Sequence, residues 1–395
     1  MTERAIRVLH SFASLNRGGI ETWLMNILRQ RSEELHFDFL LDRPGGVYEE
    51  EARSYGCKIF YTSQTGKLQK RLSMVGLGRY PLGLEQVLKE NPYDVFHCHT
   101  NEFGGDIMKA AFKAGIPVRV VHSHNTALAR GNKSIEMSIR SLRFRTINRY
   151  RIRKYATDIV ACSSDAGRFL VGEYWDIDPR CRTIFCGISL DRFNEPINKW
   201  KRNKFRKNHG IPLDKIVVGH AGSMGPSLQK NHNFLIEIFQ ELVKKDDRYF
   251  LYMAGDGPLR STIEHAVNKR GLSDHICMPG IVDNIPSLMI HGFDVHLLPS
   301  LFEGLPVVGL EAVASGCFTV CSDTITKDFT EFFSERVTTV SLRKSPSVWA
   351  DKVEEAVRKR IPAQEGIALV KKSPFSITSS LEAMANMYKT RLKSK

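Results

Sequence analysis

Short runs of β-branched and other apolar residues alternate with stretches of helical periodicity along nearly the whole chain. This alternation is typical of parallel sheets covered by helices, rather than of all-α or all-β folds. We expect strands at Ile6–Phe12, Val95–Cys98, Arg119–Ser123, Asp158–Cys162, Thr183–Cys186, Ile216–Ala221, Tyr249–Ala254, His275–Met278, Val295–Leu298 and Phe318–Cys321. The pattern therefore predicts an α/β architecture built from Rossmann-like domains.

The length of 395 residues exceeds what one hydrophobic core usually supports, so two domains are expected. A polar and basic stretch, interrupted by Pro196 and Pro212, marks the boundary between them. Near the end, Leu381, Met384 and Tyr388 lie at helical spacing and predict a final helix. The expected division is 1–190, 191–375 and a C-terminal helix at 376–395.

The charge balance indicates an acidic partner. Lysine and arginine number 57 against 43 aspartate and glutamate residues, which leaves a net charge of +14. A phosphorylated ligand, an anionic lipid surface and nucleic acid would all attract such a chain. We find no recognised nucleic-acid motif, and no apolar run long enough for a membrane span or a signal peptide. We therefore expect a cytoplasmic protein that binds no nucleic acid.

The segment Pro299–Ala312, PSLFEGLPVVGLEA, carries the strongest functional signal. It follows a predicted strand and opens a helix, whose first N–H groups and dipole favour phosphate. Glu303 precedes that helix and Glu311 lies within it, so two carboxylates flank a phosphate-binding turn. In a nucleotide sugar, the ribose and the hexose lie on either side of the diphosphate and present hydroxyls to carboxylates. The alternative interpretation is a helix with an acidic cap and one exposed glutamate.

Two further glycine turns follow predicted strands. Gly222 and Ser223 end the segment VGHAGS, and Lys230 follows shortly before an amphipathic helix. A lysine there would neutralise charge that builds on a departing diphosphate, although an isolated lysine is more often a solvated surface residue. Gly18 and Gly19 form the other turn, whose backbone can approach a phosphate or sugar or can serve structure alone.

Histidines alternate at the ends of two predicted strands of the first domain. His122 and His124, followed by Asn125, share one side of a strand, and His97 and His99 show the same alternation. A metal site can be imagined from them, but nothing in the sequence fixes four ligands. Contact between one histidine and sugar hydroxyls is the favoured interpretation, with no metal.

Seven segments occur in the order found in one known family: RVLHSF with RGGIET, VHSHNT, DIVACSSDAGRFL, QKNHNFLIEIF, AGDGPLR and LPSLFEGLPVVGLEAVASG. Over residues 6 to 325 the chain resembles the retaining glycosyltransferases of family 4, in particular those that build bacterial capsular polysaccharides and exopolysaccharides. The resemblance implies a GT-B fold, in which two Rossmann-like domains face each other across a cleft and the final helix crosses back to the first domain. The first domain would bind the acceptor and the second the donor.

The resemblance also implies roles for individual residues. Glu303 would contact the donor hexose, Glu311 the ribose and Lys230 the diphosphate, while His124 would lie near the transferred sugar. We therefore expect Glu303, Lys230 and His124 to be catalytic. The expected substrate-binding residues are Gly18, Gly19, Asn125, Gly222, Ser223, Gly255, Ile281, Gly304, Leu305, Pro306 and Glu311.

The resemblance implies transfer with retention of anomeric configuration, without a metal or other cofactor. A UDP-sugar is the expected donor, with GDP-sugars as the main rival, and the acceptor would be a saccharide or lipid-linked. Ser223 stands where family members commonly have an arginine, and Cys186-Gly187-Ile188-Ser189 replaces the usual Asn-Gly-Ile-Asp. A catalytically silent binding protein therefore remains an alternative, as does a nucleotide-sugar epimerase of the same architecture.

The segment Ser138–Lys154 combines seven basic residues with apolar ones: Arg140, Arg143, Arg145, Arg149, Arg151, Arg153 and Lys154. A basic amphipathic helix in the acceptor domain would suit peripheral docking at an anionic membrane. A solvated helix face that also packs on its own sheet is the equally weighted alternative.

Overall fold

The structure, a computed structural model, describes residues 4–30, 32–62, 84–100, 104–126, 135–195 and 198–394, with the side chains of 135–144 left out. The described chain divides into two compact units. Unit 1 comprises the described residues of Met1–Thr126 and Arg130–Gly187 together with Ile377–Lys395, and unit 2 comprises Ile188–Ser376. Two Rossmann-like units, as the alternation of strands and helices predicts, are thus present.

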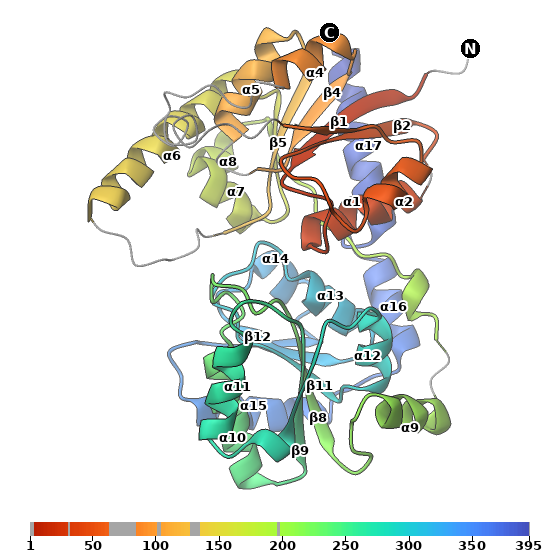
Figure 1. Ribbon diagram of the computed structural model, residues 1–395, viewed down its shortest axis with the longest axis vertical. Helices are drawn as coiled ribbons and strands as arrows, with labels where there is room; N and C mark the ends of the chain where they lie inside the picture. Colours follow the sequence, from red (N-terminus) through yellow and green to blue (C-terminus); the bar gives the residue numbers. More distant parts are fainter. Residues whose placement is uncertain are drawn as a thin grey trace. The chain divides into compact units, whose positions relative to one another are not determined.

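Unit 1 is built on a seven-stranded sheet in the order β3-β2-β1-β4-β5-β6-β7, and every pair is parallel. The strands are β1 Ile6–Phe12, β2 Leu35–Leu41, β3 Ile59–Tyr61, β4 Val95–Cys98, β5 Val118–Ser123, β6 Asp158–Ala161 and β7 Cys181–Thr183. Helices cover both faces of this sheet (Figure 1). They are α1 Gly19–Arg29, α2 Glu49–Ser54, α4 Leu84–Glu90, α5 Gly104–Lys113, α6 Ile135–Tyr155, α7 Ser164–Val171, α8 Tyr174–Ile177 and α17 Ile377–Lys393.

The last helix, α17, is part of unit 1 although the whole of unit 2 precedes it in the sequence. Its buried residues include Met384, Met387 and Tyr388, which lie on one face at helical spacing. Ser380 donates from its Oγ to the carbonyl of Phe185 at 2.6 Å, and Arg391 binds the buried carboxylate of Asp158 at 2.9 Å. These contacts fasten the C-terminus of the chain to the sheet of unit 1.

Unit 2 is built on a six-stranded parallel sheet in the order β10-β9-β8-β11-β12-β13. The strands are β8 Ile216–Ala221, β9 Tyr249–Ala254, β10 Ile276–Gly280, β11 Val295–Leu298, β12 Phe318–Ser322 and β13 Val337–Val340. The α-helices are α9 Lys199–Asn208, α10 His232–Lys245, α11 Arg260–Lys269, α12 Ile285–His291, α13 Val307–Ala314, α14 Lys327–Thr330, α15 Pro346–Val357 and α16 Ala363–Lys371. Short 3₁₀ turns occur at η2 Asp191–Phe193 and η3 Ser273–His275.

Both faces of the unit 2 sheet are buried, which explains why its strands are almost continuously apolar. One core contains Phe239 of α10 and Trp349 of α15 against the sheet. The opposite core contains Met289 of α12 and Ala312 of α13, with Phe293 between α12 and β11. Among the helices that the structure describes, none has an apolar stretch long enough to span a bilayer.

The strand order locates the ligand-binding edge of each unit. In both sheets the order reverses next to the first strand, between β1 and β4 in unit 1 and between β8 and β11 in unit 2. In open parallel sheets, ligands bind beyond the carboxyl ends of the strands at such a reversal. The residues that follow β1, β4, β8 and β11 are therefore the places to search for a site.

One predicted strand was misplaced. We expected Thr183–Cys186, but β7 is Cys181–Thr183. Among the strands that the structure describes, β7 pairs with β6 alone, and the pairing ends at Ala161 opposite Thr183. Strand β6 itself ends at Ala161, so the chain leaves the sheet after Thr183.

Candidate active site

The connection from β11 to α13 places a carboxylate at the reversal point of unit 2. Strand β11 ends at Leu298, and Glu303 lies in the turn that follows it. Glu303 is buried, with 6% of its surface exposed. Its Oε1 accepts hydrogen bonds from Lys230 Nζ at 2.7 Å and from Ser300 Oγ at 2.9 Å, while Oε2 accepts from Gln229 Nε2 at 2.9 Å. The carboxylate is thus fixed from three directions.

Lys230 comes from the connection between β8 and α10, and it reaches Glu303 because β8 and β11 are neighbours in the sheet. Leu228 and Asn231 flank the Gln229–Lys230 pair with φ values of +56° and +53°. Among the described residues these are the only non-glycine residues with positive φ. Such a conformation costs free energy and persists only where the surroundings enforce it, as at binding sites. Asn231 Nδ2 also donates to the carbonyl of Pro299 at 3.1 Å, which ties the two connections together.

Three glycines let the strand ends of unit 2 approach each other closely. A Cβ added to Gly222 would lie 2.9 Å from carbons of the Lys230 side chain, so the lysine stem runs directly over this backbone. A Cβ on Gly255, whose φ is +141°, would lie 2.0 Å from the carbonyl oxygen of Gly222. Gly255 N–H in turn donates to Gly280 O at 2.8 Å. Larger residues at Gly222 or Gly255 would displace the backbone against which the Lys230 side chain packs.

Helix α13 starts at Val307, directly after Pro306. Pro306 is the N-cap residue, at φ −79° and ψ 81°. The reason is that Val307 N–H bonds to Leu305 O at 2.9 Å in a tight turn, whereas Gly309 N–H is the first to bond to Pro306 O. Gly304, Leu305 and Pro306, which lead into this turn, are buried. Because proline has no side-chain acceptor, the helix has no side-chain N-cap.

Glu311 lies in the second turn of α13 and is partly exposed. The surrounding protein nevertheless removes water from its carboxyl group and thereby raises its pKa to about 7, while the positive charges of Arg192 and Lys230 act to lower it. A carboxylate that titrates near neutrality is a common property of binding and catalytic sites. Of the other predicted donor-site residues, Ser223 is exposed and Ile281 is 64% exposed.

In unit 1, Gly18 is the N-cap of α1 in an extended conformation, and Gly19 is the first helical residue. A Cβ on Gly18 would lie 2.2 Å from Glu21 Oε2, whereas a Cβ on Gly19 would meet nothing within 4 Å. A side chain at Gly18 would therefore displace the carboxylate of Glu21, while Gly19 leaves open space at the helix start. Asn125, at the end of β5, is exposed.

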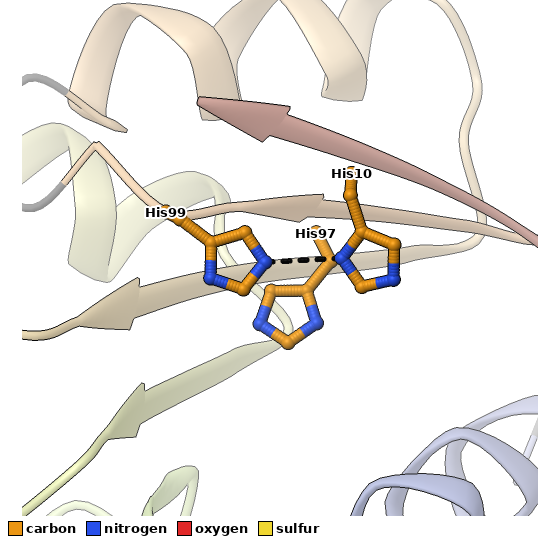
Figure 2. A group of neighbouring side chains, drawn as sticks. All are labelled: His10, His97 and His99. Carbon is orange, nitrogen blue, oxygen red and sulfur yellow. Dashed lines mark hydrogen bonds between the residues drawn. The ribbon is translucent and has the colours of Figure 1, made fainter. Parts of the chain in front are cut away.

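His124 is buried, and both of its ring nitrogens have partners. Its Nε2 lies 2.9 Å from His99 Nδ1, and its Nδ1 lies 3.4 Å from the thiol of Cys186. His99 Nε2 continues the chain to His10 Nδ1 at 3.0 Å (Figure 2), and His97 Nε2 lies 3.1 Å from His122 Nδ1. Burial lowers the pKa of His124 and of His10 to about 3, and it holds those of the other three histidines well below their usual value. At neutral pH this network is uncharged.

Several of these contacts escaped the sequence analysis. Gln229, which precedes Lys230, and Ser300, three residues before Glu303, both hold Glu303, and a search for polar neighbours would have found them. Arg192, which lies near enough to Glu311 to oppose its pKa shift, carries no signal in the sequence. His10 joins the histidine network because it is the register partner of His97 across β1 and β4.

Of the basic residues in 138–154, those with described side chains mostly bind within unit 1. Arg149 donates to the carbonyls of Phe169 and Leu170, and Arg151 pairs with Asp106. The guanidinium of Arg153 lies over the ring of Tyr174. The side chains of Arg140 and Arg143 lie outside the described part of the chain.

Two family models match the chain. The model described as Glycosyltransferase Family 4 matches residues 17–192, and the model described as Glycosyl transferases group 1 matches residues 201–368. A putative glycosyltransferase of Bacillus subtilis, EpsF, is 35% identical over 97% of this chain and 96% of its own length. The capsular polysaccharide biosynthesis glycosyltransferase CapH of Staphylococcus aureus is 24% identical over 98% of this chain and 99% of its own length.

Solved structures show the same fold. A glycosyltransferase from Rickettsia africae superimposes with a TM-score of 0.77 at 16% identity, covering 100% of both chains. Anabaena Alr3699/HepE, in complex with UDP and glucose, superimposes with a TM-score of 0.74 at 16% identity, covering 98% of this chain and 100% of that one. The predicted GT-B fold is thereby confirmed.

Proposed function

The chain belongs to the family 4 glycosyltransferases, and from that premise we propose that it moves a hexose from a UDP-sugar to a saccharide or lipid-linked acceptor with retention. Its relatives support a place in capsular or extracellular polysaccharide assembly. The Escherichia coli relative named as a galactosyltransferase takes UDP-galactose and a diphosphoundecaprenol-linked acceptor. Because nucleotide sugars are made in the cytoplasm, we place the reaction there.

The Lys230–Glu303 pair carries this proposal. A cation and a carboxylate lie 2.7 Å apart where the strand order of unit 2 reverses, and Glu311 lies in the second turn of the helix that follows. We assign the diphosphate to Lys230 and the Gly222 turn, the hexose hydroxyls to Glu303 and the ribose to Glu311. Gly255, Ser223 and Ile281 would line the remaining donor surface.

In the proposed reaction, the bond between the anomeric carbon and the diphosphate oxygen breaks first. Lys230 stabilises the charge that develops on the departing diphosphate, and Glu303 faces the oxocarbenium-like sugar. The acceptor hydroxyl forms the new bond on the face that the diphosphate leaves, and its proton passes to a diphosphate oxygen. Because Lys230 supplies the positive charge, we propose that the transfer itself needs no metal.

Unit 1 is assigned to the acceptor. We propose that its Gly18–Gly19 turn closes over the diphosphate of the donor, and that Asn125, after β5, contacts a substrate. The proposed role of His124 near the transferred sugar requires one of its ring nitrogens to exchange an internal partner for the sugar, because His99 and Cys186 occupy both. For peripheral membrane contact we propose the exposed end of α6, where Tyr150 is 58% exposed beside Lys154.

The decisive experiment supplies candidate UDP- and GDP-sugars with and without a lipid-linked or saccharide acceptor. Acceptor-dependent release of UDP, together with an unchanged anomeric configuration by NMR, would support retaining transfer. Conversion of the donor sugar without an acceptor would favour an epimerase. Binding of a nucleotide sugar with no turnover of any donor would favour a catalytically silent binding protein. The observation that favours this alternative is Ser223, which stands where family members commonly have an arginine. Chelator in the assay should leave the transfer rate unchanged.

A further inference from the structure

Helix α9 of unit 2 presents an exposed tryptophan among lysines. The helix lies at the edge of unit 2, beside α12 (Figure 1). Trp200, Lys204 and Lys207 are four and three residues apart, so they lie on one side of the helix, and all three are exposed. Trp200 has 66% of its surface exposed, and the Lys204 ammonium lies 4.9 Å from the centre of its ring. We call these three residues the α9 face.

The opposite side of α9 holds the helix to the rest of unit 2. Arg202 and Arg206 both bind the carboxylate of Asp294. Arg206, which is buried, also donates to the carbonyl oxygen of Gly292 at 3.1 Å. The contacts that fix the helix are therefore made by other residues than those of the α9 face, and packing within unit 2 does not explain why a tryptophan is exposed there.

The charges of this helix are not balanced locally. The sequence of α9, KWKRNKFRKN, contains no acidic residue. Its four lysines form no ion pair with any residue that the structure describes; they are Lys199, Lys201, Lys204 and Lys207. By contrast, Lys244 of α10 and Lys352 of α15 pair with glutamates of their own helices at 2.7 and 2.8 Å. The lysines of α9 thus keep their attraction for an anion outside the protein.

We propose that the α9 face docks on the surface of a bilayer that contains anionic lipid. Tryptophan is favoured at the boundary of membrane and water, where its ring lies at the level of the headgroups, and lysines are attracted to the anionic lipids around it. Because the other side of α9 is bound to unit 2, the helix does not insert as a free amphipathic helix does. The contact is shallow, and it should weaken as salt screens the lysines.

Nucleic acid is the other large polyanion that lysines attract. Proteins that bind its phosphates often use arginine, because the guanidinium donates two parallel hydrogen bonds to a phosphate and stacks on bases. In α9 both arginines bind Asp294 and only lysines remain outside. Lysines as point charges around one tryptophan therefore favour a lipid surface over nucleic acid.

The docking surface is separate from the transfer reaction. The α9 face contains none of the residues to which we assign the donor, and the contact proposed for the end of α6 belongs to unit 1 rather than to unit 2. The inference therefore goes beyond the proposed function. Its failure would leave the roles of Lys230 and Glu303 untouched.

Vesicle binding by the full chain tests the proposal, and tryptophan fluorescence reports on α9 directly. The chain has four tryptophans, and the other three, Trp23, Trp175 and Trp349, are at most 8% exposed. Phosphatidylcholine vesicles with about one-third phosphatidylglycerol should shift the emission to shorter wavelength and protect it from iodide, whereas pure phosphatidylcholine should not. Trp200→Ala should abolish the shift and weaken binding about tenfold.

A double variant measures the contribution of the lysines. Lys204→Gln with Lys207→Gln should weaken vesicle binding about 30-fold at low salt, since each lysine near an anionic surface contributes about fivefold. The matched control is Lys244→Gln with Lys352→Gln, which removes the same charge from α10 and α15 of the same unit. The control should bind vesicles like the unchanged protein.

Three results would each overturn the proposal: no binding to the anionic vesicles at low salt, binding that leaves the emission unchanged, or equal binding by the α9 and control double variants. Tighter binding to a DNA duplex than to the vesicles at the same salt, read from the same emission shift, would overturn it in favour of nucleic acid. Transfer to a water-soluble acceptor, measured separately, tests the proposed function and should be the same in all of these variants.

Discussion

The pKa of Glu311 gives a quantitative prediction for donor binding. Burial raises this pKa to about 7 in the unliganded protein. The proposed ribose contact requires the ionised carboxylate, because only that form accepts from both ribose hydroxyls without donating a proton. With a pKa of about 7, roughly ten-elevenths of the protein is ionised at pH 8 and one-eleventh at pH 6. The affinity for the donor should therefore fall about tenfold from pH 8 to pH 6.

The stability of the unliganded protein should change with pH in the direction opposite to the donor affinity. A carboxyl whose folded pKa is raised above its unfolded value stabilises the native state less as pH rises, so unliganded unit 2 should lose stability between about pH 4.5 and pH 7. Bound donor should reverse this loss at higher pH, since it binds the ionised form.

Calorimetric titration with a UDP-sugar at pH 6, 7 and 8 measures the effect. A UDP-sugar is preferable to UDP, whose terminal phosphate itself titrates near pH 6. Glu311→Gln should bind more weakly at pH 8, and its affinity should not change with pH. Equal affinities of the unchanged protein at pH 6 and 8, or the same slope in Glu311→Gln, would refute the assignment of Glu311 to the ribose.

Three further predictions concern named residues. Glu303→Gln and Lys230→Ala should each lower kcat about 100-fold or more, because they act on developing charge, and near-normal rates in both variants would reject these roles. The control Lys244→Ala, which removes a surface pair with Glu241, should leave kcat unchanged. Gly255→Ala should lower the free energy of unfolding of unit 2 by about 2 kcal/mol, because the added Cβ would overlap Gly222 O and the backbone φ is positive. Urea denaturation should show a much smaller loss of stability for Gly19→Ala. Asp158→Asn should lower the free energy of unfolding of unit 1 by about 3 kcal/mol, because Arg182 and Arg391 lose their carboxylate partner. The exposed Asp351→Asn should lower stability by less than about 1 kcal/mol, and equal urea midpoints for the two variants would contradict this.

The strands that the sequence identified are those buried on both faces. Ile216–Ala221, Tyr249–Ala254 and Val295–Leu298 are mostly apolar runs, and the structure has them with the predicted bounds. Strand β2, Leu35–Leu41, was missed because Asp38 interrupts its apolar pattern. Asp38 is fully buried and is held by Tyr93 Oη and Lys58 N–H, partners that only the tertiary structure supplies.

The candidate active site also has features that the sequence shows and others that only the tertiary structure supplies. The spacing of Glu303 and Glu311 around a turn was visible, since it depends on one continuous segment. The ion pair of Glu303 with Lys230 was not, because it depends on β8 lying beside β11. Likewise, the alternation of His97 and His99 was predicted, while the addition of His10 follows from the register of β1 against β4. Strand order and register are set by packing, and residue spacing does not encode them directly.

The central claim is that unit 2 holds a nucleoside diphosphate sugar at the β8 and β11 connections. A crystal structure of the chain with UDP tests it most directly. We expect the diphosphate against Lys230 and the Gly222 turn, with the ribose hydroxyls on Glu311. UDP bound elsewhere on the chain, or a Lys230–Glu303 pair that stays closed with no nucleotide beside it at saturating UDP, would contradict the claim.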